Sequence, residues 1–107
     1  EAALRSARAF YYQSIEAAWL VAQAGEKVSI DQRHDIRLAT THAVEASIKT
    51  VDAMYTLGGG SAVYADSALQ RHFRDVHMTS QHIMVAPSTL ETVGRLYLGV
   101  EAQTATL

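Results

Sequence analysis

The residues best suited to chemistry are concentrated in one short stretch, LQRHFRDVHMTSQH, which runs from Leu69 to His82. It contains three histidines, two arginines and one aspartate. Side chains of these types build metal sites, phosphate-binding helices and acid–base centres. Each of these sites requires a particular spacing, so the spacing indicates which of them the stretch can form.

The histidines do not have the spacing of metal ligands. His72, His77 and His82 follow one another at intervals of five residues. Five residues of α-helix rotate by about 500°, so successive rings point about 140° apart. Chelation from one helix needs partners three or four residues apart. Glu45 lies three residues after His42, but no second motif of that kind accompanies it. We therefore predict no metal site.

The charge balance argues against a nucleic-acid partner. The chain has 9 basic and 11 acidic residues and a net charge of −2, whereas binding to a phosphate backbone needs a basic excess. No apolar run approaches the ~20 residues of a membrane-spanning helix, so we predict no membrane partner. The chain has no cysteine, which excludes disulfides and thiolate chemistry and fits the cytoplasmic location that we predict.

One histidine has a distinctive position within this stretch. On a helix, Arg71, Asp75, Met78 and His82 would follow one face at steps of three and four residues. A histidine at the C-terminal end of such a helix is stabilised as a cation by the helix dipole and by a nearby carboxylate. His82 is therefore a candidate for acid–base chemistry. From the residues alone, an ordinary Arg71–Asp75 ion pair with a histidine at the helix end is the more economical interpretation.

The segment LGGGSAVYAD, Leu57 to Asp66, is the second candidate. Consecutive glycines interrupt a helix and expose backbone amides that can bind an anion. The segment matches neither the P-loop nor the GxGxxG pattern, and it follows a predicted helix rather than a strand. On this evidence alone, a flexible turn between helices is the simpler reading.

Helical patterns account for the rest of the chain. Apolar residues at three- and four-residue steps predict a first helix over residues 1–24, which Gly25 ends. A capping box, Ser29 to Gln32, starts a second helix that extends to about residue 57. Its early charges, Asp31, Arg33, Asp35 and Arg37, are predicted to face solvent, and Glu45 and Lys49 to form an outward pair.

Two further helices complete the prediction. The third covers residues 67–86 and ends at Pro87, and a second capping box, Ser88 to Glu91, starts a short fourth helix that reaches Gly99. No segment alternates as a strand does. The patterns predict an all-α, antiparallel four-helix bundle that forms a single domain over residues 1–107.

Three of these features, taken in order, resemble the C-terminal helical domain of the acyl-CoA dehydrogenase fold. They are the glycine loop, LQRHFRD at residues 69–75 and QH at residues 81–82. The similarity is closest to the branch of two-component, flavin-dependent monooxygenases of the aromatic hydroxylase type. It is carried by residues 55–99, and the upstream helices are compatible with it. Because the sequence opens at Glu1 inside a helical pattern, we expect the chain to be the C-terminal part of a longer flavoenzyme.

The resemblance implies roles for the candidate residues. It implies that the glycine loop contacts the phosphate of a flavin in a neighbouring subunit of a homotetramer, through Gly59, Gly60 and Ser61. It places His82 beside the substrate and the flavin C4a position as the catalytic residue. It also implies that a structural ion pair of the RxxRD motif braces the helix, through Arg71, Arg74 and Asp75.

One departure distinguishes the two branches of the fold. Acyl-CoA dehydrogenases of the common type have YEGT shortly after the RD pair, and its glutamate removes the substrate's α-proton. This chain has QHIMV there, and no acidic residue occurs between Asp75 and Glu91. Histidine, whose pKa lies near neutrality, can deprotonate a phenol or hydrogen-bond a flavin hydroperoxide. The departure therefore favours monooxygenation.

The resemblance thus predicts the oxygenase component of a two-component monooxygenase, which hydroxylates a phenolic or related small substrate through a flavin C4a-hydroperoxide. A separate flavin reductase would supply the reduced flavin, FMN or FAD. Most of the flavin site would lie outside these residues, so the chain alone should be inactive. The alternatives are an acyl-CoA dehydrogenase-type FAD enzyme and a non-catalytic helical oligomerisation module.

Overall fold

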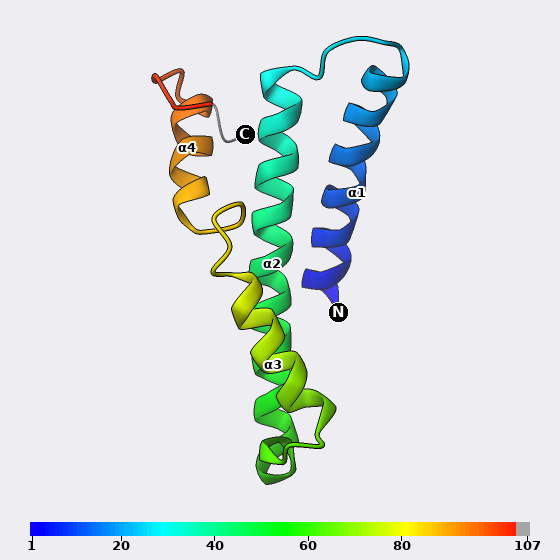
Figure 1. Cartoon of the computed structure of the whole chain (residues 1–107), viewed down its shortest axis with the longest axis vertical. Coiled ribbons are helices and arrows are strands. Elements are labelled where there is room, and N and C mark those ends of the chain that lie inside the picture. Colours follow the sequence, from blue (N-terminus) through cyan, green and yellow to red (C-terminus); the bar gives the residue numbers. More distant parts are fainter. Residues whose placement is uncertain (105–107) are drawn as a thin grey trace.

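The computed structural model describes residues 1–104, which form four α-helices and one 3₁₀ helix and contain no strand. In chain order the elements are α1 (Ala2–Gln23), α2 (Ile30–Gly58), η1 (Gly59–Val63), α3 (Ala68–Thr79) and α4 (Ser88–Tyr97). Figure 1 shows α2 as the longest element, with α1 on one side of it, α3 crossing in front of its lower half and α4 beside its upper half on the side opposite α1. The predicted all-α fold with four helices is confirmed.

The first two helices have the predicted boundaries because strong local signals define them. Gly25, just beyond α1, adopts φ +76°, the left-handed conformation that glycine tolerates. At the start of α2 the Ser29 hydroxyl accepts a hydrogen bond from the Gln32 N–H at 3.1 Å. The Gln32 side chain in turn accepts one from the Ser29 N–H at 3.0 Å. The first predicted capping box is therefore present.

The third helix is shorter than predicted, because α3 ends at Thr79 rather than at Ala86. The hydroxyls of Thr79 and Ser80 donate to carbonyl groups of their own helix, those of Asp75 and His77. Bonds of the same kind occur inside α2, at Thr40, Ser47 and Thr50, so they do not by themselves end α3. Residues 80–87 instead form consecutive turns, so the apolar pattern that suggested a longer helix continues through non-helical backbone.

The second capping box is absent. Pro87 is the N-cap of α4 and is itself helical in conformation, and no side chain caps the helix. Ser88 therefore already lies inside α4, one position too far along to cap it. The first-turn amides of Thr89 and Leu90 find backbone partners instead, the carbonyls of Ala86 and Pro87. The helix ends at Tyr97, slightly before the predicted Gly99.

α2 is the common packing partner of the other helices. Within residues 1–104, α1, α3 and α4 each contact α2 and none of the three contacts another. All three run antiparallel to α2 (Figure 1). The radius of gyration is 16.6 Å, against about 13 Å for a compact domain of this length. The bundle is thus open, with one central helix.

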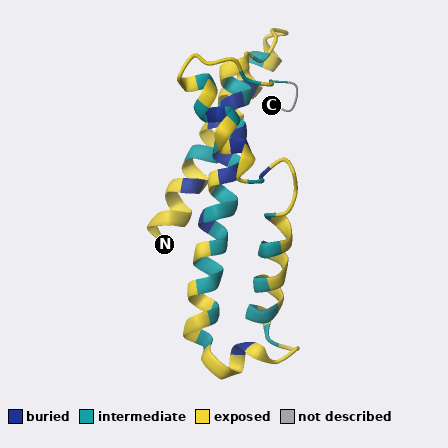
Figure 2. Cartoon of the chain, turned by 90° about the vertical axis from the view of Figure 1, so that its left-hand side faces the viewer, coloured by how far each residue is buried: buried dark blue, intermediate teal, exposed yellow. Residues whose placement is uncertain are grey.

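Burial is correspondingly sparse. Among residues 1–104, the buried apolar residues are five alanines and two valines. Those of α2 that are buried, whether apolar or polar, all lie between His34 and Ala46, and Figure 2 shows little burial toward the opposite end of the helix. Large apolar side chains lie at the surface instead, among them Trp19, Leu57, Met78, Ile83 and Leu98. No helix in residues 1–104 is long and apolar enough to cross a membrane.

Candidate functional site

His82 lies in the turn between α3 and α4, and it is exposed. Its N–H donates to the Thr79 carbonyl at 3.1 Å, and its own carbonyl accepts from the Val85 N–H at 2.9 Å. Its ring nitrogen Nδ1 accepts a hydrogen bond from the Met84 N–H at 3.2 Å. The prediction that His82 ends a helix is therefore wrong, because the helix has already stopped at Thr79. The C-cap of α3 is Ser80, so His82 lies beyond the end of the helix and does not form part of its last turn.

In the part of the chain that the structure describes, the predicted ion pair of the RxxRD motif is not formed. Arg71, Arg74 and Asp75 are all exposed. Among residues 1–104, the ion pairs within 4.0 Å are His34–Asp35 and His77–Asp52. A solvated pair on an exposed helix gains less than about 1 kcal/mol, which is too little to hold long side chains in one geometry. The outward Glu45–Lys49 pair is likewise not formed.

The three glycines of the loop have different surroundings. Gly58 is the last residue of α2, and a Cβ added there would lie 2.9 Å from Leu69 Cδ1. Gly59 has φ +55°, and an added Cβ at Gly59 or Gly60 would meet nothing within 4 Å. The Ser61 hydroxyl donates to the Gly58 carbonyl at 2.7 Å. The loop is therefore a defined 3₁₀ turn whose backbone is uncovered at Gly59 and Gly60.

A phosphate can approach the loop at Gly60, which is exposed, whereas the Gly59 N–H already donates to the Thr56 carbonyl. Glycine has no side chain that would keep an anion from the backbone amides. The phosphate contact of Gly59, Gly60 and Ser61 stays a prediction.

The loop and His82 lie at opposite ends of α3. The helix has 12 residues, and at 1.5 Å per residue it spans about 18 Å. One copy of the chain therefore does not bring the glycine backbone and the His82 ring to the same small group.

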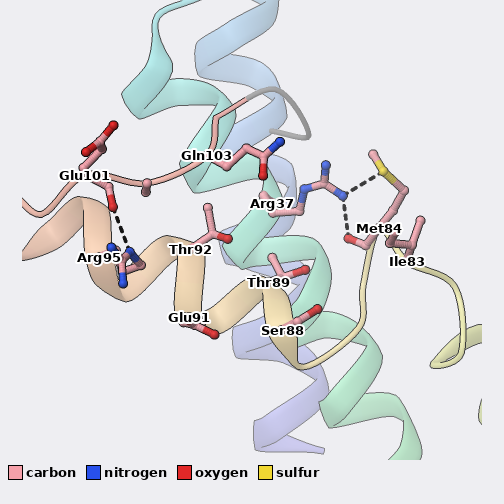
Figure 3. A pocket seen from close by; sticks show the side chains of 11 residues that line it. Arg37, Ile83, Met84, Ser88, Thr89, Glu91, Thr92, Arg95, Glu101 and Gln103 are labelled. Carbon is pink, nitrogen blue, oxygen red and sulfur yellow. Dashed lines mark hydrogen bonds between the residues drawn. The ribbon is translucent and has the colours of Figure 1, made fainter.

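Sequence reasoning missed the role of Arg37, which was expected to face solvent. Its relative exposure is 6 %. Nη1 of its guanidinium donates to the Met84 carbonyl at 2.7 Å and lies 2.9 Å from the Met84 Sδ. Figure 3 shows the side chain reaching from α2 toward Met84. Its other terminal nitrogen, Nη2, is buried without a hydrogen-bond partner in the part of the chain that the structure describes.

Other polar groups are buried on the same face of α2. His34 and Thr41 lie one turn on either side of Arg37, and each has a buried polar side-chain atom without a partner among residues 1–104. The ring of His34 packs edge-on against Tyr97 of α4, with centroids 4.5 Å apart. Steps of three and four residues could have identified this face. The alternating charges before it suggested solvent instead.

A cavity of 730 Å³ opens beside Arg37, between α2, α4 and the segment that follows α4 (Figure 3). Two arginines and two glutamates line it, Arg37, Arg95, Glu91 and Glu101, so its charges balance. A smaller hollow of 280 Å³ lies at another side of Arg37 and Met84. His82 lines neither of the two, although its neighbours in the turn line the larger one.

A second histidine is paired in a way that the sequence did not reveal. His77 Nε2 lies 2.9 Å from Asp52 Oδ1, which links α3 to α2. The His77 ring also packs against Phe73, with centroids 4.6 Å apart, and Phe73 packs against Tyr55 at the same distance. This cluster fixes the end of α2 to α3. The three histidines of the stretch are thus dispersed, as their spacing predicted.

Comparison with known proteins identifies the family of this fold. The profile of the family described as "Acyl-CoA dehydrogenase, C-terminal domain" matches residues 1–87. Since the match covers most of the chain, the chain belongs to this family, and the predicted resemblance is confirmed.

The chain is also similar to proteins named as a monooxygenase and a hydroxylase. The chain is 37% identical over 99 residues to indole-3-acetate monooxygenase of Pseudomonas putida, covering 92% of this chain and 25% of that protein. It is 32% identical over 87 residues to a pigment production hydroxylase of Rhodococcus erythropolis, covering 81% of this chain and 22% of that protein. The chain thus spans about a quarter of the length of these relatives.

A solved structure supports the fold. The HsaA monooxygenase from M. tuberculosis superimposes with a TM-score of 0.84 over 99% of this chain and 29% of that one, at 19% identity. At this level of identity the likeness concerns the fold alone.

Proposed function

We propose that this chain is the C-terminal helical domain of a longer flavoenzyme, the oxygenase component of a two-component monooxygenase that hydroxylates a phenolic or related aromatic substrate. The observation that carries the proposal is the 37% identity over nearly the whole chain to a protein named as a monooxygenase. The hydroxylase relative supports the same branch.

The site residues support monooxygenation over dehydrogenation. Removal of an α-proton from an acyl thioester needs a base such as a carboxylate, and residues 76–90 contain none. The same stretch carries His82 with an exposed ring on an ordered turn. An imidazole there can hydrogen-bond a phenolic oxygen or the oxygen that is transferred, which is the contact that hydroxylation needs.

Reduced flavin, FMN or FAD, would be supplied by a reductase and, when bound, would provide the activation of O₂. This chain would contribute contacts at two places. The exposed loop of Gly59, Gly60 and Ser61 would hold a phosphate once the Gly59 N–H or the Ser61 hydroxyl exchanges its present carbonyl partner, Thr56 or Gly58, for the anion, and His82 would face the reacting atoms. Because about 18 Å of α3 separates the two, the phosphate at the loop and the ring at His82 would belong to flavins of different subunits.

The exposed apolar side chains support assembly. Leu57 and Leu98 are 79% and 80% exposed, and Met78 and Ile83 are similarly uncovered. Each of the four α-helices carries exposed large apolar side chains, and apolar surface of this kind marks an interface where it is contiguous. We propose that the other domains of the full-length protein and further copies of this domain in a homotetramer cover it.

The proposal is tested on the full-length protein with its reductase, by following product formation and oxygen consumption together. We expect reduced flavin, O₂ and an aromatic substrate to give a hydroxylated product. His82→Ala should slow hydroxylation by about 10²- to 10⁴-fold, the usual contribution of such a group, and should leave flavin affinity nearly unchanged. His72→Ala, at an exposed position on α3, is the matched control and should retain full turnover.

The outcomes separate the alternatives. Unchanged turnover of His82→Ala would remove the assignment of this residue. Flavin reduction by an acyl-CoA without O₂ would instead identify a dehydrogenase. A full-length protein that binds no flavin would favour the oligomerisation module. The cytoplasmic location stays a prediction.

A further inference from the structure

We infer that Arg37 of α2 is a positioning residue for His82, which it reaches through Met84, and that the turn it anchors makes neutral His82 a hydrogen-bond donor at Nε2 rather than a base. The inference rests on the proposed function for its catalytic consequence. The geometry that carries it lies within residues 37–84.

Met84 connects the two side chains through the two polar groups of its backbone. Its carbonyl accepts the Arg37 Nη1 bond at 2.7 Å, and its N–H donates to His82 Nδ1 at 3.2 Å. A guanidinium bonded to a carbonyl at that distance is a charge-assisted hydrogen bond, stronger than a neutral one. Arg37 therefore holds the residue that in turn orients the imidazole.

Arg37 can hold this position because it is itself constrained. Its side chain starts from the N-terminal third of α2 and is nearly fully buried, so few other rotamers are open to it. The turn has a second anchor in Val85, which is 9 % exposed and whose N–H donates to the His82 carbonyl. His82 is thus exposed at its ring, while the Met84 N–H holds its Nδ1 and the Val85 N–H holds its carbonyl.

The hydrogen bond at Nδ1 determines the tautomer. A ring nitrogen that accepts a backbone N–H carries no proton of its own, so in the neutral imidazole the proton lies on Nε2. Nε2 is the ring atom left free to meet a substrate or cofactor oxygen. Neutral His82 then donates a hydrogen bond from Nε2 and has no lone pair there with which to remove a proton.

The chain contains a close control for this arrangement. Arg95 of α4 also donates from its guanidinium to a backbone carbonyl, that of Glu101, at 2.8 Å, and it lines the same cavity as Arg37. Its bond holds the segment after α4 rather than the His82 turn. A general effect of losing an arginine–carbonyl bond should therefore appear when either arginine is replaced by methionine. An effect on His82 should appear only when Arg37 is replaced.

The test uses full-length protein labelled with ¹⁵N-histidine, in wild-type form and as Arg37→Met, Arg37→Lys and Arg95→Met. Solid-state ¹⁵N NMR reports the tautomer, and the His82 signals are assigned by their loss in His82→Gln. We expect the Nε2–H tautomer in the wild type and in Arg95→Met, and a mixture with Nδ1–H in Arg37→Met. Lysine keeps a donor, so Arg37→Lys should restore much of the wild-type tautomer.

Turnover is measured on the same samples. We expect Arg37→Met to lower kcat by about 10- to 100-fold, the usual cost of a misplaced catalytic group, with an unchanged Kd for flavin. A wild-type Nδ1–H tautomer would overturn the inference without any variant, so the test does not depend on Arg37→Met folding. An unaltered tautomer and kcat in folded Arg37→Met would also overturn it. Failure of the proposed function is distinct, because the full-length wild type would then form no hydroxylated product, whereas the tautomer of His82 would still be the Nε2–H form.

Discussion

Replacing Gly60 by alanine should weaken flavin binding without weakening the fold. A Cβ at this position meets nothing within 4 Å, and the residue does not have a positive φ. Alanine also restricts the unfolded chain, which by itself stabilises a protein by about 0.4–1 kcal/mol where the backbone is compatible. We therefore expect the free energy of unfolding of Gly60→Ala to equal or slightly exceed that of the wild type.

The cofactor should respond differently. If a phosphate lies against this backbone, the added methyl group displaces it from the amides. Loss of one hydrogen bond to a charged group costs about 1.5–3 kcal/mol, which corresponds to about a ten- to hundredfold increase in Kd. The measurement is a flavin titration of full-length protein, followed by flavin fluorescence, together with urea unfolding of the same preparation.

Gly58→Ala is the matched control and should show the opposite pattern. Its Cβ would lie 2.9 Å from Leu69 Cδ1 and 3.2 Å from Ala62 Cβ. Overpacking costs about 1–3 kcal/mol, and replacing a helical glycine returns about 1 kcal/mol, so stability should fall by up to about 2 kcal/mol. Flavin affinity should not change. Wild-type flavin affinity in Gly60→Ala would refute the proposed contact, and a marked loss of stability there would refute the open environment of Gly60.

Two further predictions concern stability. Ser29→Ala removes the hydroxyl that accepts from Gln32 and should lower the free energy of unfolding by about 1 kcal/mol, as measured by urea unfolding against Ser6→Ala, whose exposed hydroxyl caps nothing. No difference between the two variants would contradict the capping role. Asp52→Asn weakens the link to His77, and because both side chains are over 40% exposed the loss should stay below about 1 kcal/mol. Hydrogen exchange should show it as faster opening of α3, and a change confined to α1 would count against it.

Helix boundaries that depend on local signals could be predicted from the sequence, whereas features that depend on contacts between distant segments could not. The glycine after α1 and the capping box before α2 depend on neighbouring residues only, so they could be recognised in the sequence. The end of α3 could not, because apolar periodicity continues to Val85 through a turn.

The candidate site shows the same division. His82 was found from its place in a motif, but its Nδ1 bond to Met84 depends on the conformation of a turn. The burial of Arg37 depends on α4 and on the turn before it. Met84, which Arg37 contacts in that turn, is 47 residues further along the chain. A run of alternating charges looks the same whether or not a later segment covers it. Pairings such as Asp52 with His77 have the same origin.

The central position of α2 also bears on how this domain can change over generations of sequence. Since α1, α3 and α4 contact α2 but not one another, a substitution on α1 leaves the surroundings of α3 and α4 as they were. Each outer helix can therefore vary against α2 alone, and distant substitutions without shared partners act independently. α2 has no such freedom, because its successive faces must suit three partners at once. Its sequence should be the slowest of the four helices to diverge.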